Sequence, residues 1–189
     1  MRTLWTAAEL SLDYTHVPIA FDDPALKASE FRRINPAGAV PVIVDDGFAL
    51  SESLAINLYL TKKYCSGGAE PLYPQTLEGE ANVWRWTVWA QSHLEPWVQR
   101  DALLADLRAV VAGHAAGVIE RALGILEATL AERSWLAAAY FTVADLNVAA
   151  VLSPSRAAHV DLTRHLHVRD WLTRCYARPA AVATRERFA

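Results

Sequence analysis

Residues 39–53 hold the side chains best suited to bind a ligand. Pro41 precedes a short apolar run at 42–44. Glu52 and Ser53 follow a turn and lie where an apolar helix begins. The first turn of a helix presents unpaired N–H groups to anions, and a carboxylate beside it attracts cations. A ligand could reach Glu52 and Ser53 here, although a Ser-Glu pair at a helix start is more often only a cap.

Two short strands and one helix must position these side chains. Residues 42–44 form an apolar run suited to a buried strand, 45–47 (Asp-Asp-Gly) form a hairpin-type turn, and 48–50 form the returning strand. Ser51 is a good N-cap residue, and the apolar residues within 54–60 continue the helix. The pattern predicts a strand, turn, strand, helix unit.

The rest of the first third mixes helical and strand patterns. Apolar residues at helical spacing predict a helix over 2–12, and β-forming residues predict a strand over 14–21 that Pro18 interrupts. A short helical or turn segment at 26–33 and strong turn residues at 35–38 lead into the stretch 39–53.

The sequence predicts only helices after a linker that contains Gly and Pro. The predicted helices cover 77–108, which Pro96 kinks or ends, and 110–132, 142–152, 168–176 and 180–187. Thr142 and Asp145 have the spacing of a capping box, with Asp in place of the usual Glu, so we assign both to structure. The segment that they begin is apolar on all sides and should be a central, buried helix.

Composition excludes several classes of protein. The chain has 189 residues, 53% of them hydrophobic, so it can bury a sizeable core. Its net charge of −3 does not indicate a basic surface that would bind nucleic acid or an anionic membrane. Cys65 and Cys175 lie far apart and match no metal spacing. No apolar run is long enough to span a bilayer, and no signal-peptide pattern begins the chain. We expect a cytoplasmic protein.

Metal and phosphate sites are not expected. The histidines are scattered, and His165 and His167 would diverge on a helix. Gly67-Gly68 lacks the Lys and Ser/Thr of a phosphate-binding loop.

Several stretches in family order resemble cytosolic glutathione transferases of the bacterial type. They are Ala-Glu-Leu-Ser-Leu-Asp-Tyr at 8–14, Asn-Pro-Ala-Gly-Ala-Val-Pro-Val-Ile at 35–43, Leu-Ser-Glu-Ser-Leu-Ala-Ile-Asn-Leu-Tyr-Leu at 50–60, Trp-Leu at 135–136, Phe-Thr-Val-Ala-Asp-Leu at 141–146, and Trp-Leu with Arg-Pro-Ala at 171–180. The resemblance implies a thioredoxin-like α+β domain at 1–65, a linker at 66–76 and an all-α domain at 77–189. It also implies a homodimer.

The same resemblance implies how glutathione, the co-substrate, would bind. Pro41 would follow a cis peptide bond, which turns the backbone of Val40 toward the cysteinyl part of the tripeptide. The γ-glutamyl carboxylate would meet Ser53 and its ammonium would meet Glu52. The hydrophobic co-substrate pocket would include Trp89, His93 and Trp97.

The sequence departs from the family pattern in the segment that normally supplies the residue beside the glutathione sulfur. Family members normally begin with a strand and a loop that holds a Tyr, Ser or Cys near the glutathione thiol, and this sequence starts after both. We therefore expect an incomplete first domain, with the catalytic residue encoded upstream of Met1 or the sheet repaired by rearrangement or by a partner chain. Thr3 and Thr6 are weak substitutes. Two functions stay open: a transferase that conjugates the glutathione thiolate to a small hydrophobic electrophile, and a catalytically weak or inactive binding or interaction protein on the same fold.

Overall fold

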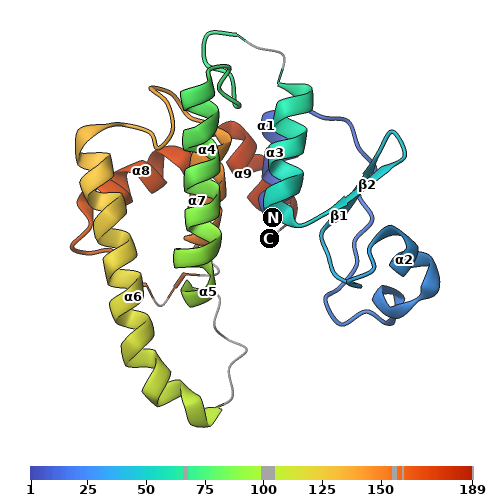
Figure 1. The fold of residues 1–189 in the computed structure, drawn as a ribbon, viewed down its shortest axis with the longest axis horizontal. Coiled ribbons are helices and arrows are strands. Elements are labelled where there is room, and N and C mark those ends of the chain that lie inside the picture. The colour runs from blue at the N-terminus through green and yellow to red at the C-terminus, as the bar shows by residue number, and fades with distance from the viewer. Residues whose placement is uncertain (66–67, 99–104, 155–156, 159, 189) are drawn as a thin grey trace.

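A computed structural model describes residues 1–65, 68–98, 105–154, 157–158 and 160–188. The elements, in chain order, are α1 (Arg2–Glu9), η1 (Pro24–Lys27), α2 (Ser29–Ile34), β1 (Val42–Asp45), β2 (Phe48–Ser51), α3 (Ser53–Tyr64), α4 (Leu77–Trp89), η2 (Ala90–Leu94), α5 (Glu95–Val98), α6 (Ala105–Glu132), α7 (Val143–Val151), α8 (Leu166–Tyr176) and α9 (Pro179–Phe188). Figure 1 shows the hairpin and α2 on one side and the later helices on the other. The expected order, α+β first and helical afterwards, is confirmed.

The predicted hairpin is present. β1 and β2 pair antiparallel, with Val42 opposite Ser51 and Asp45 opposite Phe48. Hydrogen bonds from Lys63, at 2.8 Å, and from Tyr64, at 2.6 Å, lower the pKa of Asp45 to about 2. The charged carboxylate therefore fastens the hairpin to the C-terminal turns of α3.

The predicted strand at 14–21 is wrong. Residues 13–20 have no regular secondary structure, and the sheet of the described residues contains only β1 and β2. A strand needs a neighbour to satisfy its N–H and C=O groups, and Pro18 removes one donor. The β-forming side chains accordingly stay in solvent, with Val17 68% and Phe21 85% exposed.

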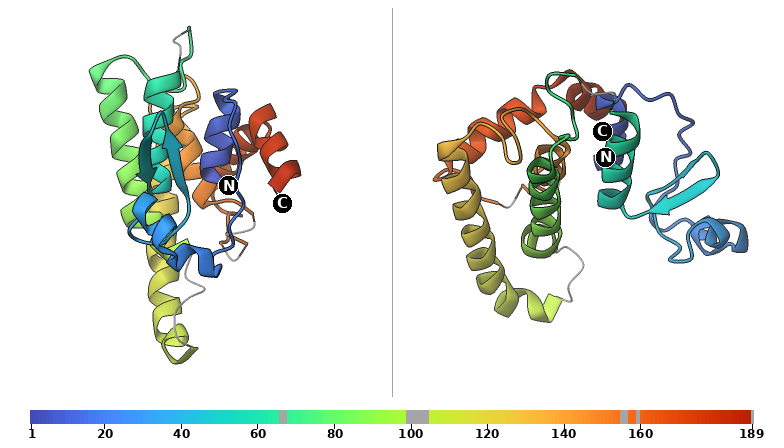
Figure 2. Two further views of the ribbon diagram at one scale, coloured as in Figure 1. Left: turned by 90° about the vertical axis from the view of Figure 1, so that its right-hand side faces the viewer. Right: turned by 45° about the horizontal axis from the view of Figure 1, so that its top comes forward.

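α1 connects the two parts of the molecule. It packs against α3, α7 and α9, and Figure 2 shows its blue ribbon between the ribbons of α3 and α9. Its Trp5 is buried and lies 6.2 Å from the ring of Phe141 and 5.9 Å from that of Tyr176. The helix ends at Glu9, earlier than the predicted 2–12.

α7 is the buried helix that the sequence predicted. Every residue from Val143 to Val151 is buried, and Thr142 and Asp145 form a capping box at its start. Asp145 is fully buried and accepts hydrogen bonds from the N–H of Leu136, at 2.9 Å, and from the indole of Trp171, at 3.0 Å. Burial raises the pKa of this carboxyl, and its hydrogen bonds oppose the shift.

The long helix predicted over 77–108 is interrupted before Pro96. α4 ends at Trp89, and residues Ala90–Leu94 form a wider π turn before α5. Proline lacks an N–H and its ring clashes with the carbonyl four residues earlier, and a π turn relieves both problems. The part of the prediction at 99–104 lies outside the described residues. The next helix begins at 105, earlier than the predicted 110.

A carboxylate on α6 docks α8. Glu127 accepts hydrogen bonds from the backbone N–H of His167, at 3.1 Å, and of Val168, at 3.0 Å.

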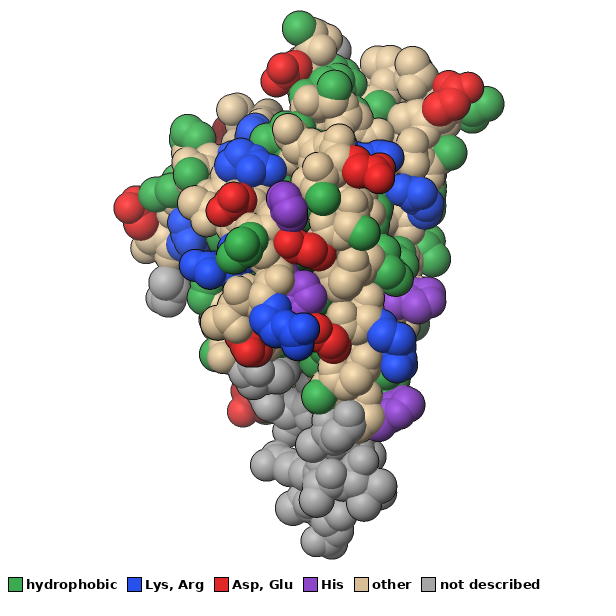
Figure 3. Space-filling view, turned by 90° about the vertical axis from the view of Figure 1, so that its left-hand side faces the viewer, with side chains coloured by type: hydrophobic (Ala, Val, Ile, Leu, Met, Phe, Trp, Pro, Cys, Tyr) green, Lys and Arg blue, Asp and Glu red, His purple; other side chains and the backbone are tan. Residues whose placement is uncertain are grey.

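Figure 3 shows the face of the molecule that lies on the left in Figure 1. Acidic, basic and histidine side chains are interspersed over this face, so the surface does not carry charge of a single sign. Within the described ranges, no helix has both the length and the hydrophobicity to cross a membrane.

Replacing Asp145 tests how far the fold depends on the capping box. The Asp145→Ala variant leaves the buried indole N–H of Trp171 and the N–H of Leu136 without an acceptor, so we expect the free energy of unfolding to fall by about 3 kcal/mol or more. Urea unfolding followed by circular dichroism measures the loss. Asp161→Ala, which removes an exposed carboxylate from a local turn with Thr163, is the control and should unfold like the wild type. Equal effects of the two substitutions would contradict the assignment.

Candidate functional site

The loop before β1 is held by a buried asparagine. The side-chain amide of Asn35, which is 3% exposed, donates to the carbonyl of Ala39 at 2.7 Å, and its oxygen accepts from the N–H of Ala37 at 3.2 Å. The peptide bond between Val40 and Pro41 that follows is cis. The sequence identified residues 35–38 only as a turn, so the positioning role of Asn35 was missed.

Gly38 lets this loop approach η1. Its φ is +62°, and a Cβ at this position would lie 2.8 Å from the carbonyl oxygen of Leu26. A side chain would meet both the strain of the left-handed conformation and a clash with backbone. The shape of the loop therefore depends on a glycine here.

The backbone of Val40 is available to a ligand. Among the described residues, no hydrogen bond engages its N–H or C=O group. Pro41 is exposed and has no N–H of its own. An extended peptide can pair with such a residue as an added strand pairs with a sheet edge.

Glu52 connects β2 to α3 in a strained conformation. β2 ends at Ser51 and α3 begins at Ser53, so one residue makes the whole change of direction. Glu52 does so with φ of 68° and ψ of 109°, and its exposed side chain makes no capping hydrogen bond. Such a conformation costs on the order of 1–3 kcal/mol for a residue other than glycine, and strained residues are concentrated at ligand sites. Ser51, the predicted N-cap, is the last residue of the strand instead.

Arg2 is the residue of this region that sequence reasoning missed. It is 4% exposed, and its guanidinium donates to the hydroxyl of Ser53 at 3.2 Å and to the carboxylate of Glu95 at 2.7 Å. It therefore joins the first turns of α1 and α3 to α5. Glu95 balances the charge of Arg2, so the partial positive charge that favours an anionic ligand group at Ser53 comes from the first turn of α3. The only signal was an arginine three positions before Trp5, which places both residues on one face of the helix.

Comparison with known proteins identifies the family. Residues 1–63 match the family described as the N-terminal domain of glutathione S-transferase, and residues 111–179 match the one described as its C-terminal domain. Glutathione S-transferase 3 of Zea mays is 32% identical over 191 residues, covering 95% of this chain and 85% of the relative. The chain belongs to the glutathione S-transferase family.

Solved structures share the fold of this chain. Glutathione transferase F7 from Populus trichocarpa matches with a TM-score of 0.82 at 26% identity, covering 98% of this chain and 92% of that one. Ure2p in complex with S-hexylglutathione matches with a TM-score of 0.86 at 23% identity, covering 96% and 91%. The first part of this chain is therefore a thioredoxin-like domain, and the second is the family's helical domain.

Neither threonine of α1 is presented as a sulfur-activating donor in this member of the family. Thr6 is fully buried, and its hydroxyl donates to the carbonyl of Arg2 at 3.3 Å. The hydroxyl oxygen of Thr3 is also buried and has no hydrogen-bond partner within the part of the chain that the structure describes. Both hydroxyls are thus enclosed by protein.

The three aromatic residues expected in the co-substrate pocket separate into two groups. Trp89 and His93 stack with an interplanar angle of 9° and ring centroids 6.4 Å apart. Trp97 instead packs edge-on against His114 of α6, at 5.4 Å. The π turn between Trp89 and Trp97 shifts the angular spacing of the side chains, which the sequence pattern of a regular helix did not anticipate.

A separate cavity lies at the other ends of α1 and α3. It has a volume of about 240 Å³ and is lined by Glu9, Leu10, Tyr64, Cys65, Glu70, Pro71, Leu72, Phe141 and Arg178. Arg178 is already paired with Glu9 at 2.7 and 2.8 Å and stacks over the ring of Phe141. None of the residues expected to hold glutathione or its co-substrate lines this cavity.

Gly38→Ala tests the loop geometry. We expect the free energy of unfolding to fall by about 2 kcal/mol, because positive-φ strain and the clash with Leu26 act together. Gly47→Ala is the matched control, since Gly47 has a φ of +80° but open space around its Cβ position. That variant should lose only the strain contribution of about 1 kcal/mol in urea unfolding. Equal losses would show that the contact with Leu26 does not constrain the loop.

Proposed function

We propose that this glutathione transferase family member binds glutathione at Val40, Pro41, Glu52 and Ser53 and conjugates its thiolate to a small hydrophobic electrophile. The observation that carries the proposal is the first turn of α3, where a strained, exposed Glu52 precedes a Ser53 whose hydroxyl is held by buried Arg2. One end of a ligand can meet a carboxylate and a positively charged helix terminus at this position. Glutathione has both complementary charges on its γ-glutamyl group.

Each part of the tripeptide has a partner of suitable chemistry in this proposal. The γ-glutamyl ammonium pairs with Glu52, and its carboxylate meets Ser53 and the free N–H groups of the helix start. The cysteinyl residue pairs with the backbone of Val40 beside Pro41. The cysteinyl thiol releases its proton to solvent, and the thiolate forms a bond to an electrophilic carbon, from which a leaving group departs with its electron pair. No metal takes part, and Trp89, His93 and Trp97 form walls for the co-substrate.

A glutathione-binding protein without strong catalysis is the second candidate. The enclosed hydroxyls of Thr3 and Thr6 favour it, because neither is presented to a bound thiol. The two candidates share the binding site and differ only in turnover. Turnover of glutathione with an aryl halide at ordinary transferase rates selects the enzyme, whereas binding without turnover selects the second candidate.

Glu52→Gln tests the binding site directly. The substitution removes the charge that pairs with the γ-glutamyl ammonium, so we expect the Kd for glutathione in calorimetry to rise about tenfold or more. Glu70→Gln, an exposed carboxylate that lines the separate cavity, should bind as the wild type does. An unchanged Kd in Glu52→Gln would refute the placement of the γ-glutamyl group.

The proposal includes a homodimer in which the first domain of each subunit packs on the helical domain of the other. Large apolar side chains are exposed on both parts: Val44 at 59% and Phe48 at 50% on the hairpin, and Trp84 at 50% and Val88 at 56% on α4. Trp84 and Val88 are four residues apart and share one face of the helix. Covering such residues is a large part of what stabilises a dimer.

Trp84→Glu tests this interface. We expect the wild type to have the mass of a dimer in light scattering and the variant that of a monomer, because the substitution places a charge in an apolar contact. Ile125→Glu is the control, since Ile125 is similarly exposed, at 49%, but lies on α6. A monomeric wild type, or a dimeric Trp84→Glu variant, would contradict the proposed interface.

The remaining parts of the proposal come from the sequence. We retain the boundaries 1–65, 66–76 and 77–189 for the glutathione-binding domain, the linker and the helical domain. A cytoplasmic location agrees with the free thiols of Cys65 and Cys175. The assignment to a bacterial type stays a prediction.

A further inference from the structure

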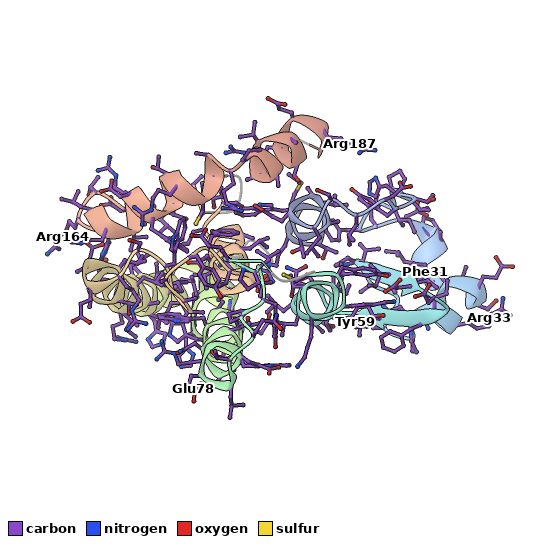
Figure 4. All side chains as sticks on the ribbon, turned by 90° about the horizontal axis from the view of Figure 1, so that it is seen from above. Phe31, Arg33, Tyr59, Glu78, Arg164 and Arg187 are labelled. Carbon is purple, nitrogen blue, oxygen red and sulfur yellow. The ribbon has the colours of Figure 1, made fainter. Side chains whose placement is uncertain are left out.

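The cavity between the last turns of α1 and α3 is separate from the proposed glutathione site. Arg2 and Ser53 join the first turns of the two helices. Their last residues, Glu9 and Tyr64, both line the cavity. Figure 4 looks onto this side of the molecule and shows α1 and α3 end-on beside each other. The last carbonyl groups of a helix carry partial negative charge, so two helices contribute negative potential to one cavity.

The basic residues that could balance this potential are engaged elsewhere. α1 has no basic residue in its last turn. In the last turn of α3, Lys62 pairs with Glu80. Lys63 pairs with Asp45 and Asp46, at 2.8 and 2.7 Å. None of these side chains lines the cavity, so carboxylates outside it take up the charge of both lysines.

The charged side chains of the cavity leave one negative charge unbalanced. Arg178 donates to both oxygens of Glu9, at 2.7 and 2.8 Å, so these two charges cancel. Glu70 is exposed and, among the described residues, its carboxylate forms no ion pair or hydrogen bond. An anion would have to displace Glu9 from Arg178 and would be repelled by Glu70. A cation meets a carboxylate that is not engaged.

The rest of the lining is apolar and limits the size of a ligand. Leu10, Pro71, Leu72 and Phe141 supply it. The carbonyl of Leu72 accepts from the N–H of Val143 at 2.8 Å, which ties this wall to the start of α7. The volume of about 240 Å³ is below the range of roughly 300–1,000 Å³ for drug-sized ligands, so only a compact molecule fits.

We propose that this cavity binds a compact organic cation, an ammonium group on a short hydrocarbon body. The ammonium group lies at Glu70 and the ends of α1 and α3, where every charge that is not already balanced is negative. The hydrocarbon body lies against Leu72 and Phe141. α3 has 12 residues, which place this site about 18 Å from the glutathione site at its other end. Both sites can therefore be filled at once.

Titration with 2-phenylethylammonium chloride, followed by NMR, tests the site. The wild type should bind with a Kd on the order of 1 mM, as expected of a small ligand that forms one ion pair. Phenylacetate, an anion of similar size, should not bind at that concentration. In Glu70→Gln the Kd for the amine should rise about fivefold, the size of one solvent-exposed ion pair. Glu78→Gln is the matched control and should keep the wild-type Kd, because Glu78 is exposed and Figure 4 shows it on the outer side of α4.

Cys65 supplies a second measurement at the same cavity. Its thiol is free and partly exposed, whereas Cys175 is fully buried, and burial raises the pKa of the Cys175 thiol. Iodoacetamide should therefore alkylate Cys65 first. The amine at a concentration equal to its Kd fills half of the cavities, so it should slow this alkylation about twofold, as measured by mass spectrometry.

The Glu52 carboxylate could also attract an amine, and its variant separates the two sites. Glu52→Gln should leave the Kd for 2-phenylethylammonium unchanged. A Kd that rises in Glu52→Gln but not in Glu70→Gln would place the amine at the glutathione site and overturn the proposal. Absence of binding at about 10 mM amine, or alkylation of Cys65 at an unchanged rate, would overturn it as well. Glutathione binding by the wild type bears only on the proposed function.

Discussion

A carboxylate enclosed by protein must accept hydrogen bonds from nearby donors. The buried carboxylate of Asp145 therefore fixes the positions of the helical-domain segments that supply its donors. Its donors come from the segment before α7, from α7's own cap and from α8, at distances of 2.9–3.1 Å. Each donor is itself buried, so none can turn to water as an alternative. The start of α7 is therefore held in one place, and α7 is the helix against which α4, α1 and α3 pack.

The link from this core to the ligand region passes through buried polar contacts. Asn147 of α7 accepts from Asn57 of α3 at 2.7 Å and donates to Thr87 of α4 at 3.1 Å. Arg2 adds the ion pair with Glu95 of α5. These contacts set the height and rotation of α3 against the helical domain, and thus the position of Glu52 and Ser53 at its first turn. Apolar packing alone is less directional and would define that position less sharply.

The opposite side of the site is organised by local backbone geometry. Between α2 and β1 the chain has no large core to rest on, and Asn35 and Gly38 give the loop its shape through hydrogen bonds and a close backbone approach. The two sides of the candidate site are thus held in place by different interactions. Glu52 is held by a helix packed in the core, whereas Val40 is held by a self-contained turn, and a ligand that spans both would tie the turn to the core.

The sequence predicted those features whose cause is local. The hairpin at 42–51, the all-buried helix at 143–151 and the all-helical second part follow from turn residues, capping spacing and apolar periodicity, which act over a few residues. The strand at 14–21 failed because a strand exists only with a neighbour, and propensity does not supply one.

The residues of the candidate site also fall into those that a local pattern predicts and those that depend on tertiary contacts. Val40, Pro41, Glu52 and Ser53 were recognisable because they lie close together in the chain, at a strand start and a helix start. Arg2 and Asn35 were not, because their roles arise from contacts with Ser53, Glu95 and the loop carbonyl. By itself the sequence determined which segments form and where a ligand would meet them. Only the tertiary structure decided which charges stand beside that ligand, because hydrogen bonds and ion pairs between distant segments depend on packing that no local pattern encodes.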